Sequence, residues 1–204
     1  MYEKEIIEML NEFHIMPKSL LSQYLQVRYN LSANLADGQI FSAVKRKKCR
    51  FSGKDNEYVA LKKETEWNLL YEKRAKAFAV FMFITKPKRS APLNEPYKYP
   101  DFVVCNKNEK FIDFIYNGYN YEIYCIPKNY EALYSEQLRK KEIPQKSYEF
   151  TRRVLIYDKD SDLDKFFNVG FTFFFHVDDD YNVEYQGKVS DEQREDAWSD
   201  VSVI

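Results

Sequence analysis

Cysteine and histidine, the side chains that most often bind metals or act as nucleophiles, are few in this chain and stand far apart. The three cysteines, Cys49, Cys105 and Cys125, contain no C-x-x-C pair, and the two histidines are His14 and His176. A structural zinc site needs four nitrogen or sulfur ligands, usually at tight spacing, so we expect none here. Nothing in the spacing points to Cys–His nucleophilic catalysis. The sequence also lacks a P-loop, a G-x-G-x-x-G and a G-x-S-x-G motif.

A second group of side chains has the chemistry for binding nucleic acid. Gln39 and Arg46 can form hydrogen bonds with base edges, whereas the neighbouring lysines suit phosphates. The alternative is that the basic run is only the solvated end of a helix. The residues that we predict to contact DNA are Gln39, Ser42, Lys45, Arg46, Lys47, Lys48, Arg50 and Lys54.

Charge is distributed unevenly along the 204 residues, although the formal net charge is only −1. Residues 1–96 contain 17 Lys or Arg and 11 Asp or Glu, residues 97–176 contain 12 of each, and residues 177–204 contain 2 and 9. A basic first part and an acidic tail are typical of proteins that bind nucleic acids. We interpret the tail as a solvated segment; the alternative is that it lies against the basic part and competes with DNA.

Three short helices and a hairpin account for residues 1–64. Apolar residues at helical spacing predict helices over residues 3–13, 17–28 and 37–48, the last with Asp37 as N-cap and Ile40, Phe41 and Val44 buried. Two strands, residues 49–51 and 57–61, flank a turn-rich loop. This order predicts a winged helix-turn-helix, in which the third helix enters the major groove and the hairpin touches the DNA backbone. The alternative is a winged helix that contacts only protein.

The remaining residues predict an α/β domain, so that the whole chain is α+β. Residues 65–96 are expected to form a long connecting helix, with Thr65 as N-cap and its end near residue 84, followed by a linker over residues 86–92. The domain of residues 97–187 is expected to hold a mixed sheet, and residues 188–204 form the acidic tail. Strands are predicted at residues 101–106, 111–117, 120–126, 153–157, 170–177 and 183–186, and helices at residues 129–141 and 162–167.

The order helix, three strands, helix, strand, together with Pro100-Asp101 and Glu122-Ile123-Tyr124, resembles the restriction-endonuclease-like, or PD-(D/E)xK, superfamily. The resemblance implies that Asp101 and Glu122 are the two carboxylates that hold Mg²⁺ in that superfamily. Tyr124 stands where the superfamily has a catalytic lysine, and a phenol cannot supply its positive charge. Lys128, at the start of the next helix, is the candidate substitute.

Two interpretations of these residues follow. In the first, the chain is a Mg²⁺-dependent DNA nuclease with Asp101, Glu122 and Lys128 as catalytic residues. In the second, which we favour, Asp101 is a turn residue, Glu122 is an ordinary charged strand residue, and the domain is catalytically silent. No cofactor is then required.

The arrangement as a whole, over residues 3–186, is similar to the replication-relaxation proteins and related proteins of plasmids and integrative elements in Firmicutes. This similarity implies a DNA-binding protein that acts in the replication or mobilisation of such an element, or in its regulation. Double-stranded DNA is the expected partner, and the second domain is expected to serve dimerisation or partner docking. An interaction adaptor without DNA binding is a further alternative.

Two features of the sequence bear on location. The longest uncharged apolar stretch has nine residues, 77–85, which is too short to span a membrane. The first residues, Met1 to Glu5, do not combine a basic start with an apolar run, so we expect no signal peptide. A cytoplasmic location is the expectation.

Overall fold

The computed structural model describes residues 2–61, 66–87, 96–107, 110–140, 151–158 and 172–188. The chain forms two compact units, one of residues Met1–Ala75 with Lys86–Tyr99 and one of residues Lys76–Thr85 with Pro100–Ile204. The division falls inside helix α4 (Leu69–Thr85), between Ala75 and Lys76. The expected α+β class, with a mixed sheet in the second unit, is confirmed.

The first unit consists of three helices and a small antiparallel sheet. The helices are α1 (Tyr2–Phe13), α2 (Lys18–Tyr29) and α3 (Ala33–Lys45), and their apolar faces bury Leu10, Leu20 and Ile40 completely. The strands β1 (Ile15–Pro17), β2 (Arg50–Ser52) and β3 (Tyr58–Ala60) pair in the order β1-β3-β2. The sequence pattern predicts only a break between helices at residues 14–16. The strand β1 is only three residues long and pairs with a strand more than 40 residues away, so no local pattern reveals it.

Helix α3 begins and ends earlier than predicted. Its N-cap is Ser32, whose hydroxyl accepts a hydrogen bond from the Leu35 amide at 3.4 Å, so the assignment of Asp37 as N-cap is wrong. Serine favours the N-cap position as strongly as aspartate does, and the earlier start adds a full turn. The helix stops at Lys45, and Lys47 then adopts a positive φ of 58°.

The side chains that α3 buries also differ from the prediction. Its buried residues are Ala36, Ile40 and Ala43, whereas Phe41, expected in the core, is 52% exposed. Phe41 follows Ile40 by about 100° around the helix and therefore points away from the core.

Residues 97–99 are held against α2 by polar and aromatic contacts. The Arg28 guanidinium donates to the Tyr97 carbonyl at 3.2 Å, and the Tyr97 amide donates to the Arg28 carbonyl at 2.6 Å. The rings of Tyr24 and Tyr99 are stacked, with centroids 5.2 Å apart. Arg28 is further paired with Glu5 of α1 at 2.9 Å, so one charge pair links α1 and α2. The segment just before the second unit is thereby tied to the first.

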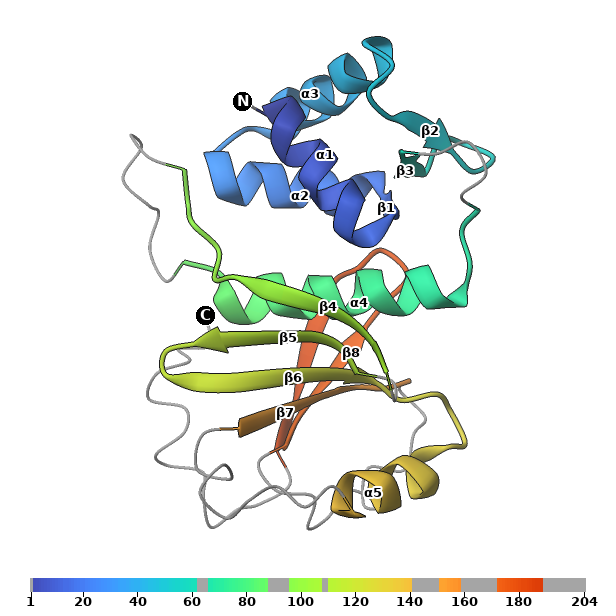
Figure 1. Cartoon of the computed structure of the whole chain (residues 1–204), viewed down its shortest axis with the longest axis vertical. Coiled ribbons are helices and arrows are strands. Elements are labelled where there is room, and N and C mark those ends of the chain that lie inside the picture. Colours follow the sequence, from blue (N-terminus) through green and yellow to red (C-terminus); the bar gives the residue numbers. More distant parts are fainter. Residues whose placement is uncertain are drawn as a thin grey trace. The chain divides into compact units, whose positions relative to one another are not determined.

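The second unit is built on a six-stranded sheet whose strands lie in sequence order (Figure 1). The neighbours β4-β5-β6 are antiparallel, β6-β7-β8 are parallel, and β9 returns antiparallel to β8. A parallel pair needs a crossover connection, and α5 (Glu131–Lys140) lies in the one between β6 and β7. The six predicted strands are confirmed, with these bounds: β4 Phe102–Lys107, β5 Lys110–Tyr116, β6 Tyr119–Cys125, β7 Thr151–Ile156, β8 Thr172–Val177 and β9 Val183–Lys188.

Alternation along the strands gives the sheet two differently covered faces. On one face, the ring of Phe81 from α4 contacts Phe102 and Phe114, with centroids 4.8 Å and 5.0 Å apart. On the other face, Tyr124 and Leu155 belong to a buried cluster against which Tyr134 of α5 packs. Because side chains two apart on a strand share a face, Glu122 lies on the same face as Tyr124.

Helix α4 begins later in the structure than the sequence predicts. The predicted N-cap, Thr65, is wrong, because the helix begins at Leu69 with Asn68 as its N-cap. The Asn68 side chain accepts hydrogen bonds from the amides of Leu70 and Tyr71 at 3.0 Å and 3.2 Å. Three predictions lie outside the described residues: most of the linker, the helix at residues 162–167 and the acidic tail after residue 188. No helix of the described part has the length and apolar character needed to cross a membrane.

Candidate functional site

The predicted DNA-contacting residues lie on α3, on the turn after it and on the β2–β3 hairpin. Ser42 and Lys45 are exposed on the helix, and Gln39 is half-buried. Arg50 is half-buried in β2. We define the basic helix–hairpin surface as the exposed cations Lys45, Arg46, Lys47, Lys48 and Lys54.

Most cations of the basic helix–hairpin surface are available for an external anion. Arg46 is paired with Glu3 of α1, at 3.1 Å between Nη1 and Oε2. An exposed pair of this kind contributes at most about 1 kcal/mol, so Arg46 can exchange Glu3 for another anion at little cost. Lys45, Lys47 and Lys48 form no ion pair with any residue that the structure describes.

An exposed apolar strip on α3 accompanies the basic residues and was not found from the sequence. Leu35 is 57% exposed, and Phe41 is exposed with its ring edge-on to Phe51 of β2 at 5.0 Å. The ammonium of Lys18 lies 5.4 Å from the centre of the Phe41 ring. Between Leu35 and Phe41 is Gly38, where a Cβ would meet no atom within 4 Å beyond the local helix backbone.

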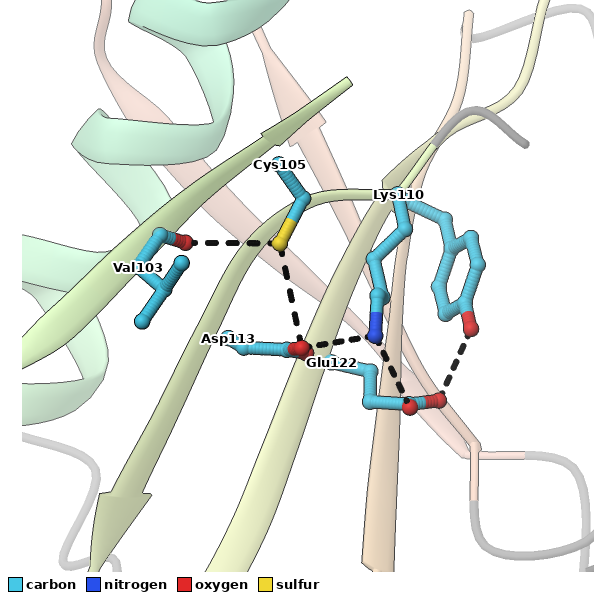
Figure 2. A network of polar contacts seen from close by, with 6 residues as sticks. Val103, Cys105, Lys110, Asp113 and Glu122 are labelled. Atoms are coloured by element: carbon cyan, nitrogen blue, oxygen red, sulfur yellow. Dashed lines mark hydrogen bonds and ion pairs between the residues drawn. The ribbon is translucent and has the colours of Figure 1, made fainter. Parts of the chain in front are cut away.

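A polar cluster lies on the sheet, on the face that holds Tyr124. The register places Val103, Asp113, Glu122 and Arg153 opposite one another on β4, β5, β6 and β7. Residues in one such row point to the same face, so the two carboxylates are cross-strand neighbours. Figure 2 shows Asp113 and Glu122 side by side, with Lys110 reaching toward both.

A β-bulge brings Lys110 to this face. Lys110 pairs with Tyr124, while Ile112 pairs with Ile123, so Phe111 is an extra residue on β5. In a regular strand, Lys110 and Asp113, which are three residues apart, would point to opposite faces. The bulge restores them to the same face, which is a common effect of bulges next to polar sites.

Three of the four carboxylate oxygens in the cluster have a polar partner within it. Lys110 Nζ lies 2.6 Å from Asp113 Oδ2 and 3.4 Å from Glu122 Oε1. The Tyr124 hydroxyl donates to Glu122 Oε2 at 2.7 Å, and Cys105 Sγ lies 3.8 Å from Asp113 Oδ2. Asp113 Oδ1 is buried and has no hydrogen-bond partner among the described residues.

The electrostatics of the cluster keep Lys110 charged. Burial alone lowers the pKa of the Lys110 ammonium, but the hydrogen bond to Asp113 and the charges of Glu122 and Asp113 outweigh it, so the pKa is raised. Burial, followed by the charge of Glu122, raises the pKa of Tyr124. Burial, followed by the charge of Asp113, raises the pKa of Cys105. At neutral pH the cluster therefore holds an ammonium, a neutral phenol and a neutral thiol.

The structure does not bring together the predicted catalytic and metal-binding residues. Asp101 is exposed and precedes β4, and β4 is separated from β6 by β5, a distance of about 10 Å between strands. The residue of the β4 segment that shares a row with Glu122 is Val103, not Asp101. Lys128 is exposed in the turn after β6, and the lysine beside Glu122 is Lys110.

The sequence contains a feature from which the pairing of Asp113 with Glu122 can be predicted. The dipeptide Asn117-Gly118 favours a two-residue hairpin turn with positive φ at both positions, and their φ values are 49° and 79°. Counting three residues outward from Tyr116 and from Tyr119 reaches Asp113 and Glu122. The position of Lys110 has no such signal, because it depends on the bulge.

Comparisons with known proteins add nothing to these geometric observations. No protein-family model matches the chain, and no curated protein matches it. Within the described residues, no group of three or more His, Cys, Asp or Glu side chains is placed to hold a metal ion.

The thiol of Cys105 reports on the charges of this cluster. We expect Asp113→Asn to lower the pKa of Cys105, because the negative charge that disfavours the thiolate is removed. Lys110→Met should raise it, because the stabilising ammonium is lost. At a fixed pH near 8, iodoacetamide should therefore modify Cys105 faster in the first variant and more slowly in the second, as measured by peptide mass spectrometry.

Cys49 serves as the internal control for this measurement. It is buried in the other unit, and its raised pKa of about 11 comes from burial and from Glu3. Its modification rate should be the same in both variants. Equal rates at Cys105 in both variants would show that the two charges do not act on the thiol.

Proposed function

We propose that this chain binds double-stranded DNA through α3 and the β2–β3 hairpin, and that its first unit is a winged helix-turn-helix. The observation that carries the proposal is the order α1, β1, α2, α3, β2, β3 with the sheet order β1-β3-β2. In this plan the third helix and the following hairpin are the DNA-contacting elements. The basic helix–hairpin surface lies on or next to these two elements.

The chemistry of this surface suits a duplex. Lys45, Lys47, Lys48 and Lys54 carry flexible ammonium groups that neutralise phosphates and thereby release counterions. Arg46 and the half-buried Gln39 are of the types that form hydrogen bonds with base edges in the major groove. The apolar strip of Leu35 and Phe41 adds side chains of the kind that contact thymine methyl groups.

Gly38 supports close approach of a partner to α3. A glycine inside a helix costs about 1 kcal/mol relative to alanine. Gly38 is exposed, lies in the helix with no positive φ, and has open space at its Cβ position. The free chain therefore has no packing reason for glycine here, whereas a surface that approaches the helix backbone does.

The cellular role that we propose is replication or mobilisation of a plasmid or integrative element, or its regulation, in the cytoplasm. The second unit is proposed to be a catalytically silent, restriction-endonuclease-like domain used for dimerisation or partner docking. Exposed Val103 and Ile115 on β4 and β5 offer apolar side chains for such a contact.

The second candidate function is a Mg²⁺-dependent nuclease. It is favoured by the convergence of Asp113 and Glu122 with Lys110, which supplies the positive charge absent at Tyr124. In this version Asp113 and Lys110 take the roles that the sequence assigned to Asp101 and Lys128.

The first prediction from the DNA-binding proposal concerns the basic residues. The double substitution Lys45→Ala and Arg46→Ala should weaken duplex binding about tenfold or more and reduce the salt slope by about 1 for each lost phosphate contact. Fluorescence anisotropy at several salt concentrations measures both. Lys4→Ala is the charge control, because Lys4 lies on α1 and is paired with Glu8. Wild-type protein that binds no duplex at low salt would favour the adaptor alternative.

The second prediction separates stability from binding at one residue. Gly38→Ala should raise the free energy of unfolding by up to about 1 kcal/mol, because alanine has the higher helix propensity. The same variant should bind duplex DNA more weakly, because its methyl group occupies the space left for the partner. Denaturant unfolding and anisotropy give the two values. Binding equal to that of the wild type would remove Gly38 from the interface.

The third prediction addresses catalysis. Purified protein incubated with plasmid DNA and Mg²⁺ or Mn²⁺ should leave the DNA intact. Cleavage that is lost in Asp113→Ala but kept in Asp101→Ala would establish the nuclease candidate instead. Cleavage that survives both substitutions would come from another site or from a contaminant.

A further inference from the structure

The two neighbouring carboxylates of the sheet, Asp113 and Glu122, already have a cation between them, the ammonium of Lys110. We propose that the ammonium of Lys110 occupies the cation position between Asp113 and Glu122, so that this chain needs no divalent metal there and excludes one. The proposal concerns the second unit and stands whether or not the first unit binds DNA. It gives a physical reason for the proposed absence of catalysis.

The oxygen atoms of the pair show why a metal does not fit. Of the four carboxylate oxygens, Asp113 Oδ2 and Glu122 Oε1 face Lys110, and Glu122 Oε2 accepts from Tyr124. Asp113 Oδ1 alone has no partner among the described residues. Mg²⁺ in proteins is usually held by one or two carboxylates, with water completing a near-octahedral shell at about 2.0–2.1 Å, and here three of the four carboxylate oxygens are already engaged by Lys110 and Tyr124. The residues present therefore do not fit the metal that the fold resemblance implies.

The charges of the row point to the same conclusion. Arg153 pairs with Glu122 in the register and is only 1% exposed. Its charge acts on Tyr124, whose pKa it lowers, although burial and Glu122 raise that pKa overall. The two carboxylates are therefore accompanied by two cations, Lys110 in contact with both and Arg153 in the same row as Glu122, so this cluster has no net negative charge to attract a divalent ion. A metal ion that bound the two carboxylates would have to displace the Lys110 ammonium, which would then be exposed to water.

The β-bulge at Phe111 places the Lys110 side chain on the face of the sheet that holds the two carboxylates. Lys110 is three residues from Asp113, and only the extra residue of β5 turns both to one face (Figure 2). A lysine at this place keeps its flexible chain along the strand and its ammonium between the two acids. Tyr124 completes the arrangement, because its hydroxyl holds Glu122 by the oxygen that faces away from Lys110.

Removal of the internal cation should create a metal site. Lys110→Met leaves two neighbouring carboxylates without their ammonium, so the variant should unfold at a lower temperature than the wild type in EDTA. Mn²⁺ or Mg²⁺ should then raise its melting temperature, because an ion that binds only the folded state stabilises it. The wild type should show no such rise. Isothermal titration with Mn²⁺ should give binding at least about tenfold tighter in Lys110→Met than in the wild type, a difference of about 1.4 kcal/mol.

Two matched variants make the test specific. Lys110→Arg keeps a cation and should stay insensitive to metal, whereas Lys110→Met combined with Asp113→Asn should lose the gained binding. If Lys110→Met does not fold, Lys110→Gln gives the same comparison with a side chain that can still donate to a carboxylate. Mn²⁺ binding by the wild type as tight as by Lys110→Met would overturn the proposal, and so would the absence of any gain in the folded variants. Loss of duplex binding in the Lys45 and Arg46 variant bears only on the DNA-binding function.

Discussion

The register of β5 against β6 is the constraint on which the polar chemistry of this chain depends. The Asn117-Gly118 turn closes the hairpin, and the pairing that follows from it places Asp113 opposite Glu122. A shift of one residue would send every side chain of a strand to the other face of the sheet. The face toward α4 is filled by stacked and edge-on aromatic rings, among them Phe81, Phe114 and Tyr121. The cluster of Asp113, Glu122 and Lys110 lies on the opposite face, where its charged groups contact one another.

The consecutive residues Arg152 and Arg153 show how a buried charge is stabilised on each face of the sheet. Both are buried in β7, and alternation sends them to opposite sides. Arg152 donates to the Tyr121 hydroxyl at 2.8 Å and lies 3.5 Å from the centre of the Tyr119 ring, so a hydrogen bond and a cation–π contact stabilise its charge. Arg153 lies in the row of Glu122 and Asp113. Buried charges are tolerated when such partners surround them, and the removal of one partner is costly.

The first unit differs from the second, because the side chains of its candidate site lie on the surface of α3 and not in a buried cluster. Helix α3 commits Ala36, Ile40 and Ala43 to the interior and leaves Leu35, Phe41 and Lys45 outward. An exposed phenylalanine on a helix whose last residue, Lys45, begins a run of four consecutive cations combines an apolar side chain with positive charge. That combination is the basis of the DNA-binding function that we propose, because base methyl groups and phosphates lie within reach of one helix in the major groove. A site of this kind is set by the rotational phase of the helix, which places Ile40 in the core and its neighbour Phe41 on the surface.

The sequence alone determined the helices of the first unit, the six strands of the larger sheet and the run of cations at the end of α3, because these depend on local periodicity, turn residues and composition. It also contained the pairing of Asp113 with Glu122, which follows from counting outward from the Asn117-Gly118 turn. Only the tertiary structure decided the rest. Strand β1 exists because β3 pairs with it across more than 40 residues, and Lys110 reaches the acidic pair because a bulge shifts the register. Both depend on hydrogen bonds between segments, and such partners leave no mark in the local order of residues.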